Sequence, residues 1–331
     1  MEVAYTEHVP ITDDSSVGEA RRRGLLIADR LGFDAVRSGE FGLLITEASR
    51  NVLLHGGGGQ TIIAGTRNAN DAVGRVLALD NGPGIADISK AISDGFSTGG
   101  TMGGGMGAMK RIATSLDVFT GKSGTIVLME LGEAPQQNGL QIAGIAIPYP
   151  GERFCGDAWT YHQTTERTLI LLVDGLGHGP YAAEAADEAV ETFHKWAERP
   201  PNEILSRIHD SSKKTRGAVA AVAEIRPQEK SLTYEAVGNI AASIVTNQGS
   251  RSLVSHSGTL GVASPRIQEF KERWGSDSIL IMHSDGLQTR WDLSSYSGLV
   301  SRHPALIGAA LFRDFRRQRD DASVVVVKAE A

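Results

Sequence analysis

The chain has 331 residues, a formal net charge of −6, and a composition of 41% hydrophobic and 22% charged residues. This length is sufficient for two ordinary domains. The net negative charge does not indicate a basic surface that would bind nucleic acid or an anionic membrane. No apolar run approaches the ~20 residues needed to span a bilayer, and the N-terminus has no signal-peptide pattern. The single cysteine, Cys155, excludes an internal disulfide and fits a reducing compartment. We expect a cytoplasmic protein that binds neither nucleic acid nor membrane.

Helical periodicity dominates the first part of the chain. Apolar residues recur with a spacing of three and four from about Ser16 to Leu31, and again from about Arg37 to His55. The segment GRVLALDNGPG that follows predicts a strand that ends in a turn. A further helix is expected to begin near Gly107, and GTIVLMEL at Gly124–Leu131 predicts a final buried strand.

A polar stretch, GEAPQQNG at Gly132–Gly139, separates this part from a second one that is rich in strand signals. Seven apolar segments predict strands there: LQIAGIAI, TLILLVD, AVAAVAEI, SLTYEAV, ASIVT, SILIMHSD and ASVVVVK. Helices are predicted at about Tyr181–Trp196, Asn202–Lys214 and Pro304–Arg317. Strands this apolar indicate two packed sheets under helical layers. We therefore expect two α/β domains, 1–133 and 141–331, joined by a linker at 134–140.

The first part contains a candidate nucleotide site. Glu47, Asn51 and His55 are spaced by four and share one helix face. The carboxylate of Asp80 at a strand end is suited to accept a hydrogen bond from an exocyclic amine, and an amide oxygen such as that of Asn51 suits Mg²⁺. The glycine-rich run Ser97–Gly107 either forms a slack linker or exposes successive N–H groups to phosphates.

Four motifs, carried by three stretches of the chain, resemble those of the GHKL ATPases in type and order. They resemble most of all the small anti-sigma and stressosome serine kinases of the RsbT/RsbW type. The matching stretches are TEASRNVLLHG, DNGPGIADISKAISDGFSTGGTMGGGMGAMKRI and SGTIVL, within about residues 8–131. The resemblance implies an α/β sandwich that binds ATP and Mg²⁺.

The resemblance also implies a role for each matching position. Asn51 would hold the Mg²⁺ ion, and Asp80, supported by Thr125, would read adenine. Glu47 would be the catalytic base for a substrate serine or threonine hydroxyl, whereas His55 is a rim or structural residue. The glycines would shape the base pocket (Gly82, Gly84) and the phosphate lid (Gly103, Gly105, Gly107).

The second part places aspartates where its strands begin or end: Asp157, Asp174, Asp285 and the pair Asp320–Asp321. Hard carboxylate oxygens without Cys–His spacing indicate Mg²⁺ or Mn²⁺ and not zinc. Several converging carboxylates repel one another unless cations lie between them, so a two-metal site is the simplest interpretation.

These residues resemble the metal-dependent phosphatases of the protein phosphatase 2C type, in their bacterial SpoIIE/RsbX/RsbU branch. The matching stretches, over about residues 140–329, are FCGDAW, LILLVDGLGHGPYAAEAADEA, AVGNIAASIV, GTLGV, LIMHSDGL and RDDASVVVVK. The resemblance implies a four-layer αββα sandwich with two Mn²⁺ or Mg²⁺ ions.

By the same resemblance, the catalytic Asp174 would bridge both ions. Asp157 and the Gly175 carbonyl would complete one site, and Asp285 and Asp320 the other, with Asp321 as an alternative to Asp320. His178 either orients phosphate or a metal-bound water or has a turn role, and Asn239 is expected to hydrogen-bond within its loop.

Together the resemblances imply a bifunctional regulator of partner switching, with an ATP-dependent serine/threonine kinase followed by a phosphoserine/phosphothreonine phosphatase. The implied partners are a STAS-domain substrate and a sigma factor or stressosome-like regulator, and a homodimer is an additional expectation. The alternative is that the first domain binds ATP and a partner without transferring phosphate.

Overall fold

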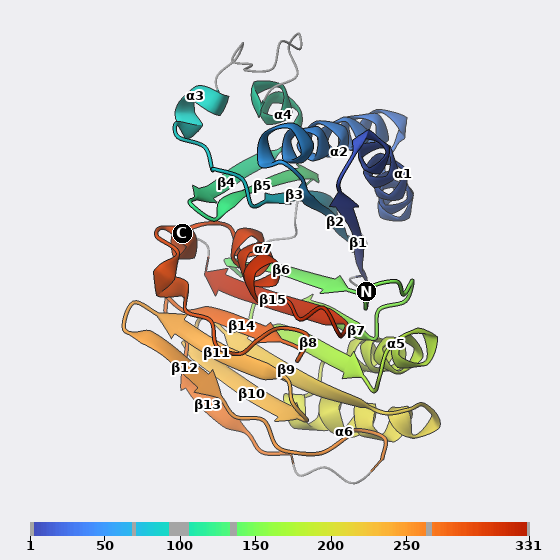
Figure 1. Cartoon of the computed structure of the whole chain (residues 1–331). Coiled ribbons are helices and arrows are strands. Elements are labelled where there is room, and N and C mark those ends of the chain that lie inside the picture. The colour runs from blue at the N-terminus through green and yellow to red at the C-terminus, as the bar shows by residue number, and fades with distance from the viewer. Residues whose placement is uncertain (1–2, 68–70, 93–105, 133–137, 263–266, 330–331) are drawn as a thin grey trace. The chain divides into compact units, whose positions relative to one another are not determined.

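The computed structural model describes residues 3–67, 71–92, 106–132, 138–262 and 267–329 (Figure 1). The chain divides into two compact units. One contains Val3–Pro135 with Leu293–Ala310, and the other contains Gln136–Asp292 with Leu311–Ala331. Both combine helices and sheets, which confirms the mixed α/β class. Across the described ranges, no helix is long and apolar enough to cross a membrane.

The unit that holds most of the first part is a five-stranded antiparallel sheet covered by helices. The sheet order is β1 (Val3–Ile11), β2 (Gly59–Arg67), β3 (Ala72–Asp80), β5 (Gly124–Gly132), β4 (Ser115–Gly121). The helices are α1 (Asp14–Leu31), α2 (Ala35–Gly56), α3 (Ile88–Ile92) and α4 (Met106–Ile112). Helices α1 and α2 pack on one face of the sheet through a shared apolar core (Figure 1).

The ends of the two long helices follow from local chemistry. The carboxylate of Asp13 accepts from the Ser16 N–H at 2.9 Å at the start of α1, and Asp34 accepts from the Arg37 N–H at 2.8 Å at the start of α2. Gly32 and Gly57 end the helices in the left-handed conformation, with φ of 74° and 69°.

The predicted elements of this unit are confirmed: both long helices, the strand before the DNGPG turn, the helix near Gly107 and the last strand. Strands β1, β2 and β4 were not predicted. The lid positions Gly103 and Gly105, like most of the expected linker, lie outside the described residues.

The other unit contains two five-stranded sheets. One has the order β13 (Phe270–Arg273), β10 (Ser231–Val237), β9 (Ala218–Arg226), β8 (Thr168–Gly175), β7 (Asp157–Gln163). The second has the order β12 (Gly249–Leu253), β11 (Ala241–Thr246), β14 (Ile279–His283), β15 (Ala322–Ala329), β6 (Leu140–Ile147). Seven of these strands coincide with the seven predicted segments, and β7, β12 and β13 were not predicted.

Helices α5 (Pro180–Lys195) and α6 (Pro201–Ser211) cover the β7–β8–β9 side of the first of these sheets. The two sheets approach closely where a Cβ on Gly144 of β6 would lie only 2.5 Å from the ring of Trp159 on β7. The predicted C-terminal helix is α7 (Pro304–Phe315), but only its residues from Leu311 onward group with this unit. A second helical layer is therefore not established by this unit alone.

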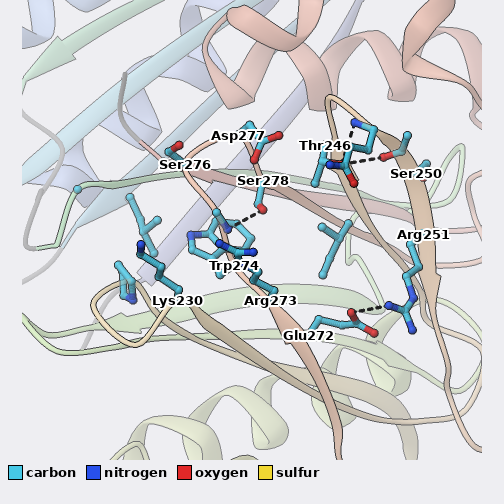
Figure 2. A pocket seen from close by; sticks show the side chains of 18 residues that line it. Lys230, Thr246, Ser250, Arg251, Glu272, Arg273, Trp274, Ser276, Asp277 and Ser278 are labelled. Atoms are coloured by element: carbon cyan, nitrogen blue, oxygen red, sulfur yellow. Dashed lines mark hydrogen bonds and ion pairs between the residues drawn. The ribbon is translucent and has the colours of Figure 1, made fainter.

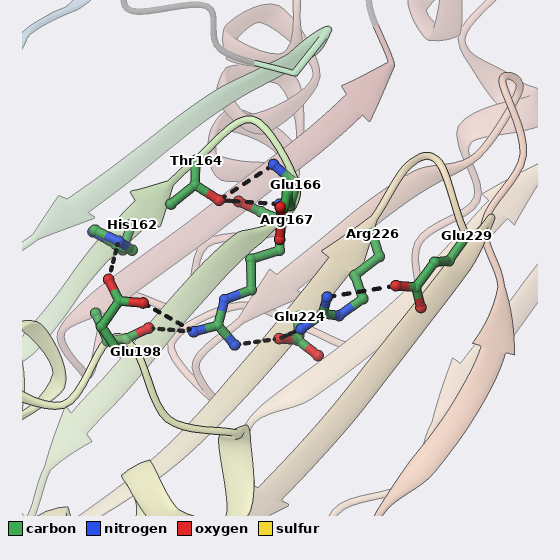
Figure 3. A network of polar contacts seen from close by, with 9 residues as sticks. His162, Thr164, Glu166, Arg167, Glu198, Glu224, Arg226 and Glu229 are labelled. Atoms are coloured by element: carbon green, nitrogen blue, oxygen red, sulfur yellow. Dashed lines mark hydrogen bonds and ion pairs between the residues drawn. The ribbon is translucent and has the colours of Figure 1, made fainter.

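A polar network fastens the β7–β8 turn to β9 (Figure 3). Nη1 of Arg167 lies 2.7 Å from Oε1 of Glu224, and Nη2 of Arg226 lies 3.0 Å from the same oxygen. Arg167 also donates to the Ala197 carbonyl at 2.8 Å. Since Arg167 and Glu224 are almost buried, their ion pair compensates charge that water does not reach, and Arg226 adds to the compensation of Glu224.

Glu235, on β10, is a buried carboxylate without such compensation. Its side chain is 2% exposed, and its Oε2 has no hydrogen-bond partner among the described residues. The pKa of Glu235 is raised to about 7, chiefly by burial and then by repulsion from Glu269 and Glu224, which Lys271 partly offsets. A carboxyl whose pKa is raised by folding destabilises the folded state as the pH rises from its unfolded pKa to its folded one.

We predict that Glu235→Gln raises the free energy of unfolding at pH 8 by on the order of 2 kcal/mol. At about pH 3 the two should differ little in stability, because the carboxyl is then protonated in the folded state and also in the unfolded state, where the pKa of Glu is about 4.3. Urea unfolding at both pH values measures the effect, with the exposed Glu229→Gln as control. An equal difference at both pH values would contradict the assignment.

Candidate active sites

The aspartates of the second part gather at one end of the two sheets. Asp157 begins β7 and pairs across the sheet with Asp174 at the end of β8. Asp285 follows β14, and Asp320 and Asp321 precede its neighbour β15. Residues opposite each other on antiparallel strands have side chains on the same face. The fold thus brings these five carboxylates to one place, as their positions in the sequence suggested.

Burial and mutual repulsion disfavour the ionised forms of the carboxyls in this cluster. Burial raises the pKa of Asp157 to about 7. The pKa of Asp174 is raised to about 9. Burial is the largest cause, and repulsion from other carboxylates of the cluster is the next: Asp157, Asp285, Asp320 and Asp321. A hard divalent cation prefers oxygen ligands, and its positive charge would offset the repulsion among these carboxylates. The chemistry of the donor set therefore fits Mg²⁺ or Mn²⁺.

Hydrogen bonds fix some of these carboxylates from outside the cluster. Oδ2 of Asp157 accepts from the hydroxyls of Ser284 at 2.6 Å and Ser323 at 2.7 Å. Oδ2 of Asp285 accepts from the Asn239 amide at 2.7 Å. The serines were missed from sequence, although both stand within two residues of an aspartate of the cluster. Asn239 was expected to bond within its own loop and instead reaches Asp285.

Asp320 and Asp321 have different surroundings. Asp321 is 2% exposed, and its Oδ1 accepts from the Tyr149 N–H at 2.7 Å. Asp320 is half-buried, and after burial its pKa is raised chiefly by Asp285. In the described residues as placed, no three acidic, histidine or cysteine side chains form a metal-binding group.

The glycine-rich turn after β8 holds the remaining predicted positions. A Cβ on Gly175 would overlap the Ala182 carbonyl, so only glycine permits this approach of β8 to α5. His178 is exposed, stacks on Tyr149 with ring centroids 4.6 Å apart, and has its Nδ1 3.1 Å from Oε1 of Glu152. This placement leaves the histidine at the rim of the cluster.

The predicted nucleotide site centres on Asp80, at the end of β3. Its Oδ1 accepts from the N–H of Gly82 at 2.8 Å and of Thr125 at 3.0 Å. A Cβ on Gly56, at the end of α2, would overlap Asp80, so helix and strand end meet at this carboxylate. The structure therefore brings together Asp80, Gly82 and Thr125 as expected.

Thr120, on β4, extends this arrangement and was missed from sequence. Its Oγ1 lies 3.1 Å from that of Thr125 and accepts from the Ile85 N–H at 2.8 Å. Gly84 has a φ of +81°, and a Cβ there would lie 2.5 Å from the Gly121 carbonyl oxygen. A threonine beside a strand-end aspartate has no distinctive spacing, so sequence offered no signal for Thr120.

The other predicted positions lie on helices. Glu47 and Asn51 are half-buried on α2, and His55 is exposed near its end. Gly107 is buried in α4, a helix of seven residues.

A cavity of about 880 Å³ lies at the opposite strand ends of the second unit (Figure 2). Its wall includes Lys230 before β10, Arg273 at the end of β13 and Asp277 before β14. Asp174 of the cluster lies near the end of β8, which pairs with the start of β9. Lys230 of the cavity wall lies beyond the other end of β9. The cavity is therefore separate from the aspartate cluster.

Comparisons with known proteins relate the two parts of the chain to two different relatives. The chain is 36% identical over 104 residues to serine/threonine-protein kinase RsbT of Bacillus subtilis (strain 168), over 31% of this chain and 78% of RsbT. It is 25% identical over 138 residues to phosphoserine phosphatase RsbX of the same organism, over 41% and 69%. A crystal structure of RsbX with magnesium shares the fold, with a TM-score of 0.53 and 19% identity over 65% of this chain and 100% of that one. The family model of Stage II sporulation protein E (SpoIIE) matches residues 164–330. Since this match spans half of the length of the chain, the chain belongs to the SpoIIE family.

Proposed function

We propose that the chain is a metal-dependent protein phosphatase that removes phosphate from phosphoserine or phosphothreonine. The observation that carries this proposal is the cluster of repelling carboxylates at one end of two packed sheets. Membership of the SpoIIE family and similarity to a phosphoserine phosphatase support it.

In this proposal Asp174 would help to hold both of two Mn²⁺ or Mg²⁺ ions. Asp157 and the carbonyl of Gly175 would hold one of them, and Asp285 and Asp320 the other. When bound, such ions would lower the pKa of a water and stabilise in-line displacement at phosphorus.

Other residues of the chain hold these ligands or stand at the rim. The hydroxyls of Ser284 and Ser323 orient Asp157, and Asn239 orients Asp285. Asp321, tied to the backbone at Tyr149, acts as a structural neighbour of Asp320. His178, at the rim beside Glu152, would meet the phosphate or a water in this proposal.

We predict that Asp174→Asn lowers phosphate release at least about 100-fold, since losing outer-shell partners of a metal site alone costs about 10–100-fold. Release from a phosphoserine protein and from an aryl phosphate, both with Mn²⁺, measures it. Asp277→Asn at the opposite strand ends is the matched control and should retain the parental rate. Equal rates for parent and Asp174→Asn would contradict the phosphatase proposal.

For the first unit we propose binding of ATP and Mg²⁺ followed by phosphoryl transfer to serine or threonine. Asp80, fixed by two backbone N–H groups, would read the adenine amine, and Asn51 would hold Mg²⁺. Glu47, one turn before Asn51 on α2, would take the proton of the acceptor hydroxyl. Similarity to a serine/threonine kinase supports this proposal.

The alternative for this unit is a module that binds ATP and a partner without transferring phosphate.

If the unit is a kinase, we predict that Glu47→Ala lowers phosphate transfer from γ-labelled ATP about 100-fold or more, while the affinity for ATP is retained. Radiolabel transfer and calorimetry measure the two quantities. ATP binding without any transfer by the parent would favour the module.

We further propose that both activities act in partner switching on a STAS-domain protein. One activity would add phosphate and the other would remove it, so that ATP occupancy sets the balance. A sigma factor or stressosome-like regulator is the proposed downstream partner, and a homodimer is the proposed assembly. Residues 1–133 and 141–331 would be the functional domains, joined through 134–140, with Leu293–Ala310 packing in the first unit.

A further inference from the structure

Helix α2 carries a line of exposed aliphatic side chains. Val36, Leu43 and Leu54 are 70%, 45% and 60% exposed, whereas the apolar residues on the opposite side of the helix are buried. Val36 and Leu54 are 18 residues apart, which is about five turns of 3.6 residues, and Leu43 lies within about 20° of their direction. Three large aliphatic side chains thus form one outward line.

The proposed catalytic base lies on this same line. Glu47 is four residues after Leu43 and seven before Leu54, so its direction is within about 40° of both. Asn51, the proposed Mg²⁺ ligand, is directed about 60° from the line, towards the buried side of α2. A protein that covers the line can therefore bring a hydroxyl to Glu47 from the side away from the core.

Two exposed arginines have no acidic partner among the described residues: Arg50 is directed about 40° from the line, and Arg21 lies beside Gly42, which is directed about 120° from it. Arg50, seven residues after Leu43, is exposed on α2. Arg21 of α1 lies across Gly42, with its Nε 3.2 Å from the position that a Cβ there would take. No ion pair joins Arg21 or Arg50 to a carboxylate within the described part of the chain. By contrast, Arg22 and Arg23 both pair with Glu19, at 2.7 and 2.6 Å.

We propose that this line, defined by Val36, Leu43, Glu47 and Leu54, is the docking surface for the protein whose hydroxyl receives the phosphate. The proposal rests on the kinase function proposed above. Its occupant is a protein that carries apolar side chains and carboxylates around its acceptor serine or threonine. The apolar groups cover the aliphatic line, and the carboxylates pair with Arg21 and Arg50.

The test compares a docking variant with a matched surface variant on one purified STAS-domain protein. Leu43→Ser with Leu54→Ser should raise the KM for this protein about tenfold or more while kcat changes little. Val254→Ser, which changes a 53% exposed aliphatic residue of the other unit, is the control and should leave KM unchanged. Phosphate release from an aryl phosphate should be the same in all of them.

The charge component has its own test. Arg21→Glu with Arg50→Glu should raise the KM, and the parental KM should rise with NaCl more steeply than that of the variant. If the parent transfers no phosphate, the kinase proposal fails. Docking is then judged from the Kd of the same STAS-domain protein by calorimetry with ATP. An unchanged KM or Kd in the Leu43→Ser/Leu54→Ser variant would overturn the docking surface. The proposal would also be overturned if these two substitutions converted a dimer of this chain to a monomer and left its affinity for the STAS-domain protein unchanged.

Discussion

Repulsion among carboxylates is the constraint on which the second unit depends. Two strand pairs bring Asp157, Asp174, Asp285 and Asp320 to one end of the sheets, and burial there raises the pKa of Asp174 to about 9. A buried arrangement of this kind is costly unless cations compensate it. The serine hydroxyls on Asp157 and the amide on Asp285 hold individual oxygens, but they add no positive charge.

The proposed nucleotide site is organised differently. Asp80 accepts hydrogen bonds from backbone N–H groups of a turn and of a neighbouring strand. Glycines at the end of α2 and after β3 leave room that any side chain would fill. The first site therefore depends on close backbone approach, whereas the second depends on compensation of charge.

Much of this arrangement was predictable from sequence. Apolar runs predicted β8, β14 and β15, and the aspartates beside them, with Asp157, predicted the cluster. Strands β1 and β4 escaped because VAYTEHVPI contains a proline and SLDVFTG is largely polar, so neither gives a buried-strand pattern. Thr120, Ser284 and Ser323 act through neighbours that are distant in sequence. The outward line on α2 escaped because apolar residues surround much of that helix, and only packing shows which of them stay exposed.

The proposed phosphatase depends on binding of divalent cations by the carboxylate cluster, which calorimetric titration with Mn²⁺ measures. We expect about two ions per chain in the parent, with a rise in Tm on binding. Asp174→Asn should lose at least one of these ions, because that carboxylate would help to hold both. A parent chain that binds no Mn²⁺ and keeps its Tm at saturating Mn²⁺ would show that the cluster is not a cation site.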